Sequence, residues 1–75
     1  MKPFDLKEAK DGAKLITRHG RKVRLICYDR LTGGKVAPMI GLMANPENTF
    51  EQLVFYNTNG QNADGVINYD LLIDD

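Results

Sequence analysis

The side chains that could do chemistry in this 75-residue chain are few and far apart. The chain has a single His and a single Cys, His19 and Cys27. A Cys/His nucleophile needs its two side chains in contact and a third group that orients the base. His19 falls in a predicted tight turn, and Cys27 falls in the strand that follows it. We therefore expect a solvated turn histidine, a buried and inert cysteine, and a protein that is not an enzyme and has no catalytic residues.

No set of residues predicts a metal ion or a cofactor. Zinc sites use three or four Cys and His ligands, and only two candidates are present. Residues 57–64 look superficially like a calcium loop, but their side chains are mostly neutral and the distal Glu is missing. Residues 31–35 contain a pair of glycines but lead into a predicted strand, whereas a phosphate-binding loop leads into a helix. We expect neither a metal nor a cofactor.

The basic residues are the best candidates for a binding site. Residues 14–28 are predicted to form a hairpin that presents several cationic side chains and an aromatic ring. Such a surface suits the phosphates of a nucleic acid, or an anionic small ligand such as a cyclic nucleotide. The candidate ligand- or nucleic-acid-binding residues are Arg18, Arg21, Lys22, Arg24 and Tyr28.

Charge is divided unevenly along the chain, although the formal net charge is zero. All ten Lys and Arg lie in residues 1–35, and six of the ten Asp and Glu lie in residues 36–75. This division indicates either a charged partner or a self-complementary surface. Alternatively, the two halves neutralise each other within one molecule, if the last strand returns to the first. These two alternatives are distinguished by whether Arg18, Arg21 and Arg24 are paired with acidic residues of the same molecule.

The elements that position these residues begin with a short helix in residues 4–12. Asp5 is a suitable N-cap, and Glu8 follows three residues later, close to a capping box. Gly12 supplies a left-handed C-terminal stop. A helix of about two turns is unstable alone, so its apolar side chains must pack against the rest of the chain.

Two strands are predicted next, in residues 14–18 and 21–29. A two-residue turn between them would place Ile16 opposite Val23, and a three-residue loop with a glycine bulge would place Leu15 there. In either register, alternation predicts that one face of the second strand packs in the core. That core face carries Val23, Leu25 and Cys27, and the other face carries Lys22, Arg24, Ile26 and Tyr28.

A third strand is predicted in residues 36–43. It is apolar on both faces, which is typical of a central strand or of one covered by a partner. Pro38 cannot donate a hydrogen bond to a ladder, so it favours an edge position. An edge strand with two apolar faces is a candidate surface for self-association.

Two further strands are predicted in residues 49–57 and 66–73, joined through a turn at 58–61. Residues 17–21 and 57–61 are similar, because each places a glycine-containing turn directly after a strand. In the fourth strand, Leu53 and Phe55 share one face, and Phe50, Val54 and Tyr56 share the other. The last strand is predicted to present four side chains on one face: Ile67, Tyr69, Leu71 and Ile73.

Together these elements predict one domain, residues 1–75, that is mainly β. A short N-terminal helix is followed by a five-stranded antiparallel meander or small open barrel. The core of so short a chain is marginal, so a homo-oligomer, most simply a dimer, is expected. No apolar run approaches the roughly 18–20 residues of a membrane span, and the N-terminus lacks a signal peptide. With its single Cys, the chain is expected to be cytoplasmic and to have no membrane partner.

Several short motifs extend over most of the chain: Phe4-Asp-Leu, Ala9-Lys10, Gly12, Thr17-Arg18, Gly20-Arg21, Val23-Arg24, Ile26-Cys27, Pro38-Met-Ile-Gly-Leu42, Tyr56-Asn-Thr-Asn-Gly60 and Tyr69-Asp-Leu-Leu72. In these motifs the chain resembles a group of short uncharacterised proteins encoded in Bacteroidales genomes, prophages and other mobile elements. The resemblance implies a small β-rich domain of phage or mobile-element type and implies no activity. A looser similarity, from Ala9 to Arg18, is to phage-encoded nucleotide sponges of the Thoeris anti-defence kind. Those sponges typically carry a Gly-Trp after the basic residue, and this chain has no Trp.

We therefore expect a non-enzymatic binding or interaction module of phage or mobile-element origin that self-associates. One alternative is a nucleic-acid-binding small β-barrel that uses the basic hairpin of residues 14–28. Another is the sequestration of an anionic small ligand, as in a cyclic-nucleotide sponge.

Overall fold

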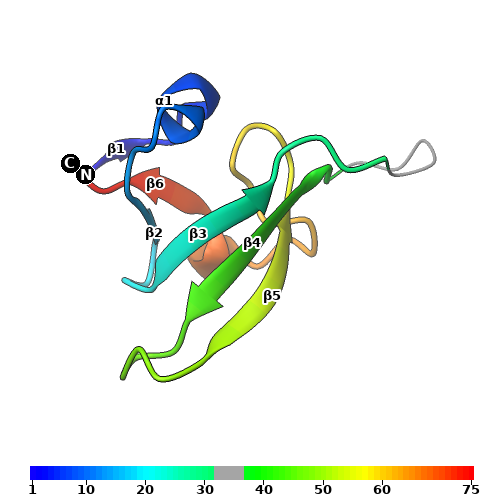
Figure 1. Cartoon of the computed structure of the whole chain (residues 1–75). Helices are drawn as coiled ribbons and strands as arrows, with labels where there is room; N and C mark the ends of the chain where they lie inside the picture. The colour runs from blue at the N-terminus through cyan, green and yellow to red at the C-terminus, as the bar shows by residue number, and fades with distance from the viewer. Residues whose placement is uncertain (32–36) are drawn as a thin grey trace.

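The computed structural model describes residues 1–31 and 37–75, and Figure 1 shows how its helices and strands are arranged. In chain order they are β1 (Lys2–Pro3), α1 (Leu6–Lys10), β2 (Leu15–Thr17), β3 (Lys22–Cys27), β4 (Met39–Ala44), β5 (Glu51–Tyr56), the 3-10 helix η1 (Ile67–Tyr69) and β6 (Leu71–Ile73). The strands form one antiparallel sheet in the order β1-β6-β2-β3-β4-β5. The prediction of a mainly β fold is confirmed, with six strands in place of five.

The last strand returns to the N-terminal part of the chain. β6 pairs with β2 on one side and with β1 on the other, so the predicted approach of the last strand to the first is confirmed. Figure 1 shows the two termini side by side as a result. The sequence does not predict β1, because this strand has only two residues and one of them is Pro3. Proline is tolerated there, since β1 is at the edge of the sheet.

The helix α1 begins and ends where its cap residues predict. Asp5 is the N-cap, and its carboxylate accepts a hydrogen bond from the Glu8 N–H at 3.1 Å. Gly12 has a φ of 98°, which is the left-handed conformation of a helix stop. On the packed side, Ala9 is buried, and its carbonyl accepts a hydrogen bond from the Tyr28 hydroxyl at 3.1 Å. The short helix is therefore fixed to the segment that follows β3.

The first hairpin has the three-residue register. The Thr17 N–H donates to the Arg21 carbonyl at 2.8 Å, and the Gly20 N–H donates to the Thr17 carbonyl at 3.0 Å. Gly20 has a φ of 88°, and Leu15 lies opposite Val23. The alternative with Ile16 opposite Val23 is excluded.

The turn after β5 repeats this geometry. The Asn57 N–H donates to the Gln61 carbonyl at 2.9 Å, and the Gly60 N–H donates to the Asn57 carbonyl at 2.9 Å. Gly60 also has a φ of 88°. The similarity between residues 17–21 and 57–61 is therefore confirmed at the level of individual hydrogen bonds.

A β-bulge interrupts the pairing of β3 with β4. Leu25 pairs with Gly41, whereas Cys27 pairs with Ile40, so Ile26 is the extra residue. Paired residues of an antiparallel sheet share a face. The side-chain alternation is therefore inverted after the bulge, and Cys27 lies on the face of Ile40.

Two predictions about side-chain orientation are wrong for this reason. Cys27 is not a core residue, because it is half-buried on the face that Ile40 occupies. Tyr28 does not share the face of Lys22 and Arg24, because it packs against the core. Strict alternation cannot reveal a bulge, which is set by the register of the partner strand.

β4 is an interior strand, since it lies between β3 and β5. The prediction of an edge position is wrong, because Pro38 precedes the first residue of the strand and its missing N–H interrupts no ladder. Val36, where the sequence predicts the strand to begin, lies outside the described residues. The exposed edge on this side of the sheet is β5.

The last predicted strand, residues 66–73, is only partly a strand. Its first half forms η1, in which the Tyr69 N–H donates to the Val66 carbonyl at 2.9 Å. Ile67 is consequently 68% exposed, whereas Leu71 and Ile73 are buried as predicted.

The core contains residues of α1 and of the strands β2 to β6. Tyr56 and Met39 are its largest fully buried apolar side chains, and the polar Thr17 is also fully buried. The core side chains are Ala9, Leu15, Val23, Met39, Met43, Val54, Tyr56, Leu71 and Ile73.

Gly60→Ala is expected to destabilise the fold more than Gly20→Ala. At either position, an alanine with positive φ costs about 1–2 kcal/mol of backbone strain. A Cβ on Gly60 would lie 2.6 Å from Cγ of Phe4, whereas nothing lies within 4 Å of a Cβ on Gly20. We expect a further loss of about 1–3 kcal/mol at Gly60 from overpacking, seen as a lower urea midpoint. Equal midpoints for the two variants would contradict a tight contact between Phe4 and the turn.

Tyr56 is expected to make the fold sensitive to alkaline pH. Burial, together with the nearby charge of Asp70, raises the pKa of the Tyr56 hydroxyl well above its usual value, and the hydroxyl donates to the Tyr69 carbonyl at 2.8 Å. On raising the pH, the unfolded chain releases this proton before the folded chain does. The contribution of the Tyr56 hydroxyl to the free energy of unfolding is therefore complete below about pH 10 and is lost as the pH rises further. The urea midpoint of the wild type should therefore fall more steeply above about pH 10 than that of Tyr56→Phe, which cannot ionise. Parallel pH profiles would refute this role.

Candidate functional site

The five predicted binding residues do not share one groove. Lys22, Arg24 and Tyr28 line a groove between α1 and β3. Arg18 lines a second groove beside β6, and Arg21 lines a third beside the turn from β4 to β5. The sequence predicts a common surface for these residues, because a flat hairpin would hold them together. Contacts with α1, β5 and β6 divide them instead.

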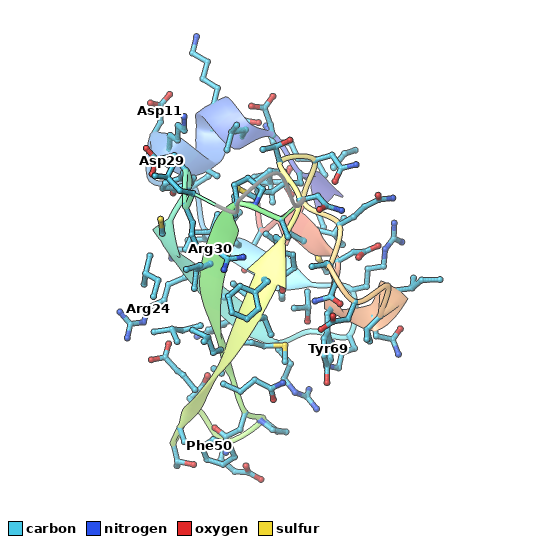
Figure 2. All side chains as sticks on the ribbon, turned by 90° about the vertical axis from the view of Figure 1, so that its right-hand side faces the viewer. Asp11, Arg24, Asp29, Arg30, Phe50 and Tyr69 are labelled. Atoms are coloured by element: carbon cyan, nitrogen blue, oxygen red, sulfur yellow. The ribbon has the colours of Figure 1, made fainter. Side chains whose placement is uncertain are left out.

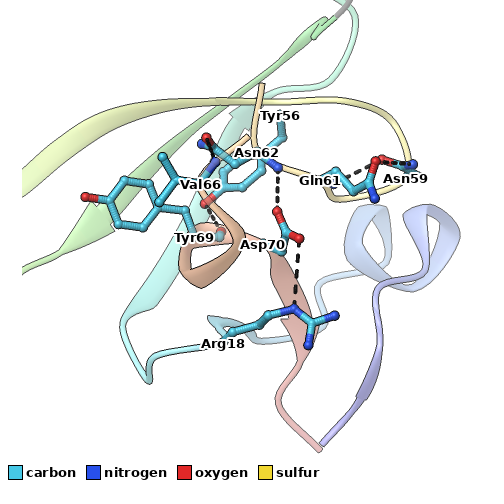
Figure 3. A network of polar contacts seen from close by, with 8 residues as sticks. All are labelled: Arg18, Tyr56, Asn59, Gln61, Asn62, Val66, Tyr69 and Asp70. Atoms are coloured by element: carbon cyan, nitrogen blue, oxygen red, sulfur yellow. Dashed lines mark hydrogen bonds and ion pairs between the residues drawn. The ribbon is translucent and has the colours of Figure 1, made fainter. Parts of the chain in front are cut away.

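Arg18 faces the acidic second half of the chain (Figure 3). Its Nε lies 3.9 Å from Oδ2 of Asp70, and its backbone N–H donates to the Asp70 carbonyl at 3.1 Å. The other carboxylate oxygen of Asp70 accepts a hydrogen bond from the Asn62 N–H at 2.8 Å. The return of the last strand to the first therefore places an acidic residue of the second half beside Arg18. The ion pair is long and the arginine is exposed, so it contributes little to stability.

Asn62 is a buried polar residue that shapes the segment between β5 and η1 (Figure 3). Its Oδ1 accepts hydrogen bonds from the N–H groups of Asp64 at 3.1 Å and Val66 at 3.2 Å. Its Nδ2 donates to the Phe55 carbonyl at 3.4 Å. One side chain thus satisfies backbone groups before and after it and directs the chain toward β6.

Arg21 and His19 belong to a small cluster at the tip of the first hairpin. Oγ1 of Thr17 accepts a hydrogen bond from the Arg21 N–H at 2.9 Å and lies 2.7 Å from Nδ1 of His19. The His19 ring packs on Tyr69, with the ring centroids 5.4 Å apart. The prediction of a solvated His19 is therefore wrong, because the turn places this half-buried side chain between Thr17 and Tyr69. Cys27 lies at the opposite end of β3 from this turn.

Arg24 makes a bidentate ion pair across the sheet. Its Nε and Nη2 donate to the two carboxylate oxygens of Glu51 at 2.7 and 2.8 Å. Hydrogen bonding to Arg24 holds the pKa of Glu51 below its usual range. Both side chains are exposed, so the pair mainly fixes their orientation. Within residues 1–31 and 37–75, Arg18 and Arg24 have carboxylate partners within 4.0 Å, and Arg21 and Lys22 have none.

A second surface is the outer face of β3, β4 and β5, opposite the core. Its cross-strand pairs include Leu42 with Leu53 and Ile40 with Phe55. Leu53 is 54% exposed, and Ile26 in the bulge is 53% exposed. The sequence carried a signal for this surface, since residues 36–43 are apolar on both faces. We define the outer face by its apolar residues: Ile26, Cys27, Ile40, Leu42, Leu53 and Phe55.

Charged groups lie at the two ends of the outer face (Figure 2). At one end Arg24, which is labelled in Figure 2, makes its ion pair with Glu51. At the other, the Arg30 guanidinium lies 4.7 Å from the centroid of the Phe55 ring and donates to the Ala37 carbonyl at 3.0 Å. An apolar centre with a polar rim is the usual composition of a protein interface.

Asn62→Ala is expected to destabilise the protein by about 2 kcal/mol. The change leaves the N–H groups of Asp64 and Val66 without their acceptor. Asn59 is the matched control, because it is exposed and bonds only to Gln61 of its own turn, so Asn59→Ala should cost about 0.5 kcal/mol. Urea unfolding followed by circular dichroism measures both values. A similar loss for the two variants would show that turn preference, not the buried network, supplies the stability.

The described residues contain no group of three His, Cys, Asp or Glu side chains placed to hold a metal ion. They also contain no helix that is long and apolar enough to cross a membrane. Comparison of the chain with protein-family models, with curated proteins and with solved structures gives no match.

Proposed function

We propose that the chain is a non-enzymatic interaction module that forms a homodimer through its outer face. The observation that carries this proposal is the continuous apolar surface of three strands, with Ile26 and Leu53 more than half exposed. Covering such a surface is favourable by about 25 cal/mol for each Å² of apolar area removed from water. A chain with a small core gains most from this, because oligomerisation supplements the core.

The charges at the ends of the outer face support a second copy as the partner. Suppose that two sheets stack face to face with a twofold axis between them, perpendicular to their strands. Each end of one outer face then lies over the opposite end of the other outer face. Arg30 of each copy then lies near the ion pair of Arg24 with Glu51 in the other, while the apolar centres cover each other. Such an isologous contact is self-complementary, which is what a closed dimer requires.

The face is a better candidate than the edge of β5. Tyr56 forms an isolated antiparallel β-bridge with Asn62, and the Ala63 N–H donates to the Phe55 carbonyl at 2.9 Å. The C-terminal part of the β5 edge is therefore already covered by the chain itself. Only the part of β5 nearer Glu51 could accept another strand. Pairing over so short a length stabilises a dimer less than the stacking of two apolar faces does.

The proposal retains the phage or mobile-element origin and the cytoplasmic location that the sequence indicates. The nucleic-acid alternative has weaker support, because its five candidate residues are divided among separate grooves. A phosphate backbone would need a continuous basic track across them.

Leu53→Lys is expected to disrupt the dimer. A lysine at this position would place a charge in the apolar centre of both copies, and the dissociation constant should rise by more than about tenfold. Ile67→Lys is the matched control, because Ile67 is at least as exposed but lies on η1, away from the outer face. Sedimentation equilibrium over a range of concentrations measures both. A wild type that stays monomeric at millimolar concentration, or equal effects of the two variants, would refute the proposal.

A further inference from the structure

The groove between α1 and β3 is large enough for a nucleotide, with a volume of about 550 Å³. Small-molecule sites typically have volumes of about 300–1,000 Å³. We propose that this groove binds a small organic phosphate, that is, a phosphate group attached to a flat ring system. This inference concerns a different surface from the proposed dimer contact and does not depend on it.

The groove exists because β2 leaves β3 early. Their pairing stops at Leu15 and Val23, since the chain comes from α1 through a left-handed Gly12. Leu25, two residues further along β3, has no ladder partner on this side. The helix therefore covers the groove from one side, while the β3 edge forms the other.

The rim of the groove carries more positive than negative side chains. Lys14, Lys22 and Arg24 line it together with Asp74, and Arg24 is already paired with Glu51. Within the described chain, neither Lys14 nor Lys22 has a carboxylate within 4.0 Å. Two lysines without a paired carboxylate beside an apolar wall attract anions from solution. A phosphate at this rim would supply the missing charge.

The interior of the groove suits the remainder of such a ligand. Leu15, Val23 and Leu25 contribute apolar surface, and Tyr28 contributes an aromatic ring. The Tyr28 ring is held in place by its hydroxyl, which donates to the Ala9 carbonyl at 3.1 Å. The Lys10 ammonium lies over this ring, 5.7 Å from its centroid. A flat ligand ring would therefore stack on Tyr28 beside or in place of this ammonium, on an aromatic ring that is already held in position. Phosphate alone would use the rim and leave this surface exposed.

A small molecule fits the groove better than a nucleic acid strand. A strand that continued past the first phosphate would meet the acidic side chain of Asp74 at the same rim. Asp74 lies beside Lys14, because its N–H donates to the Lys14 carbonyl at 2.9 Å. A single phosphate centred on Lys22 meets this repulsion less than a strand that extends along the whole rim.

The test is a titration of the wild-type protein with AMP, followed by the NMR shifts of backbone amides. Adenosine, inorganic phosphate and a single-stranded oligonucleotide are titrated in parallel. The proposal expects AMP to shift the amides of residues 12–15 and 22–28 and to bind at least about tenfold more tightly than adenosine or phosphate. Equal affinity for AMP and inorganic phosphate would overturn it, since the ring would contribute nothing. Binding of the oligonucleotide alone would also overturn it and favour the nucleic-acid alternative.

The matched variants are Lys22→Gln and Lys7→Gln. Both remove one exposed lysine, but only Lys22 lines the groove. Lys22→Gln should weaken AMP binding by about tenfold, and Lys7→Gln should change it by less than about twofold. Equal effects would reduce the interaction to net charge and overturn the site. Leu53→Lys should leave AMP binding unchanged, so failure of the groove and failure of the dimer can be distinguished.

Discussion

The position of β6 between β1 and β2 is the interaction on which the rest of the fold depends. β1, β2 and β6 have two or three residues each, and strands this short are not stable as isolated pairs. β6 supplies Leu71 and Ile73 to the core and gives both neighbours a hydrogen-bonding partner. Its arrival depends on a path set by Asn62 and Asp70, whose side chains bind backbone groups of the turns before it. A few buried polar contacts thus hold together strands that are far apart in the sequence.

The return of β6 also explains why the charge division along the chain does not produce one basic surface. Arg18 pairs with Asp70, and Arg24 pairs with Glu51 of β5. Two basic residues without a carboxylate partner in the described chain, Lys14 and Lys22, lie at the groove beside α1. Partial neutralisation within the molecule therefore leaves some positive charge at this groove.

The β-bulge at Ile26 has a similar influence on the two candidate surfaces. One extra residue turns Tyr28 toward α1, where it bounds the groove, and turns Cys27 to the outer face. The same strand, β3, therefore contributes to an apolar face on one side and a cationic groove at its edge. Apart from Arg24, which borders both surfaces, the two proposed contacts use different side chains of β3, which is why they can be tested separately.

The sequence by itself determined the features that depend on neighbouring residues. Asp5 and Gly12 mark the ends of the helix, and glycine with positive φ sets two identical turns, because these preferences act over three to five residues. The alternation of Val54 with Leu53 likewise predicts the faces of β5. Only the tertiary structure decided the bulge, the strand β1, the 3-10 helix and the partners of the arginines. Each of these depends on contacts between distant segments, whose free energy is not contained in any local pattern.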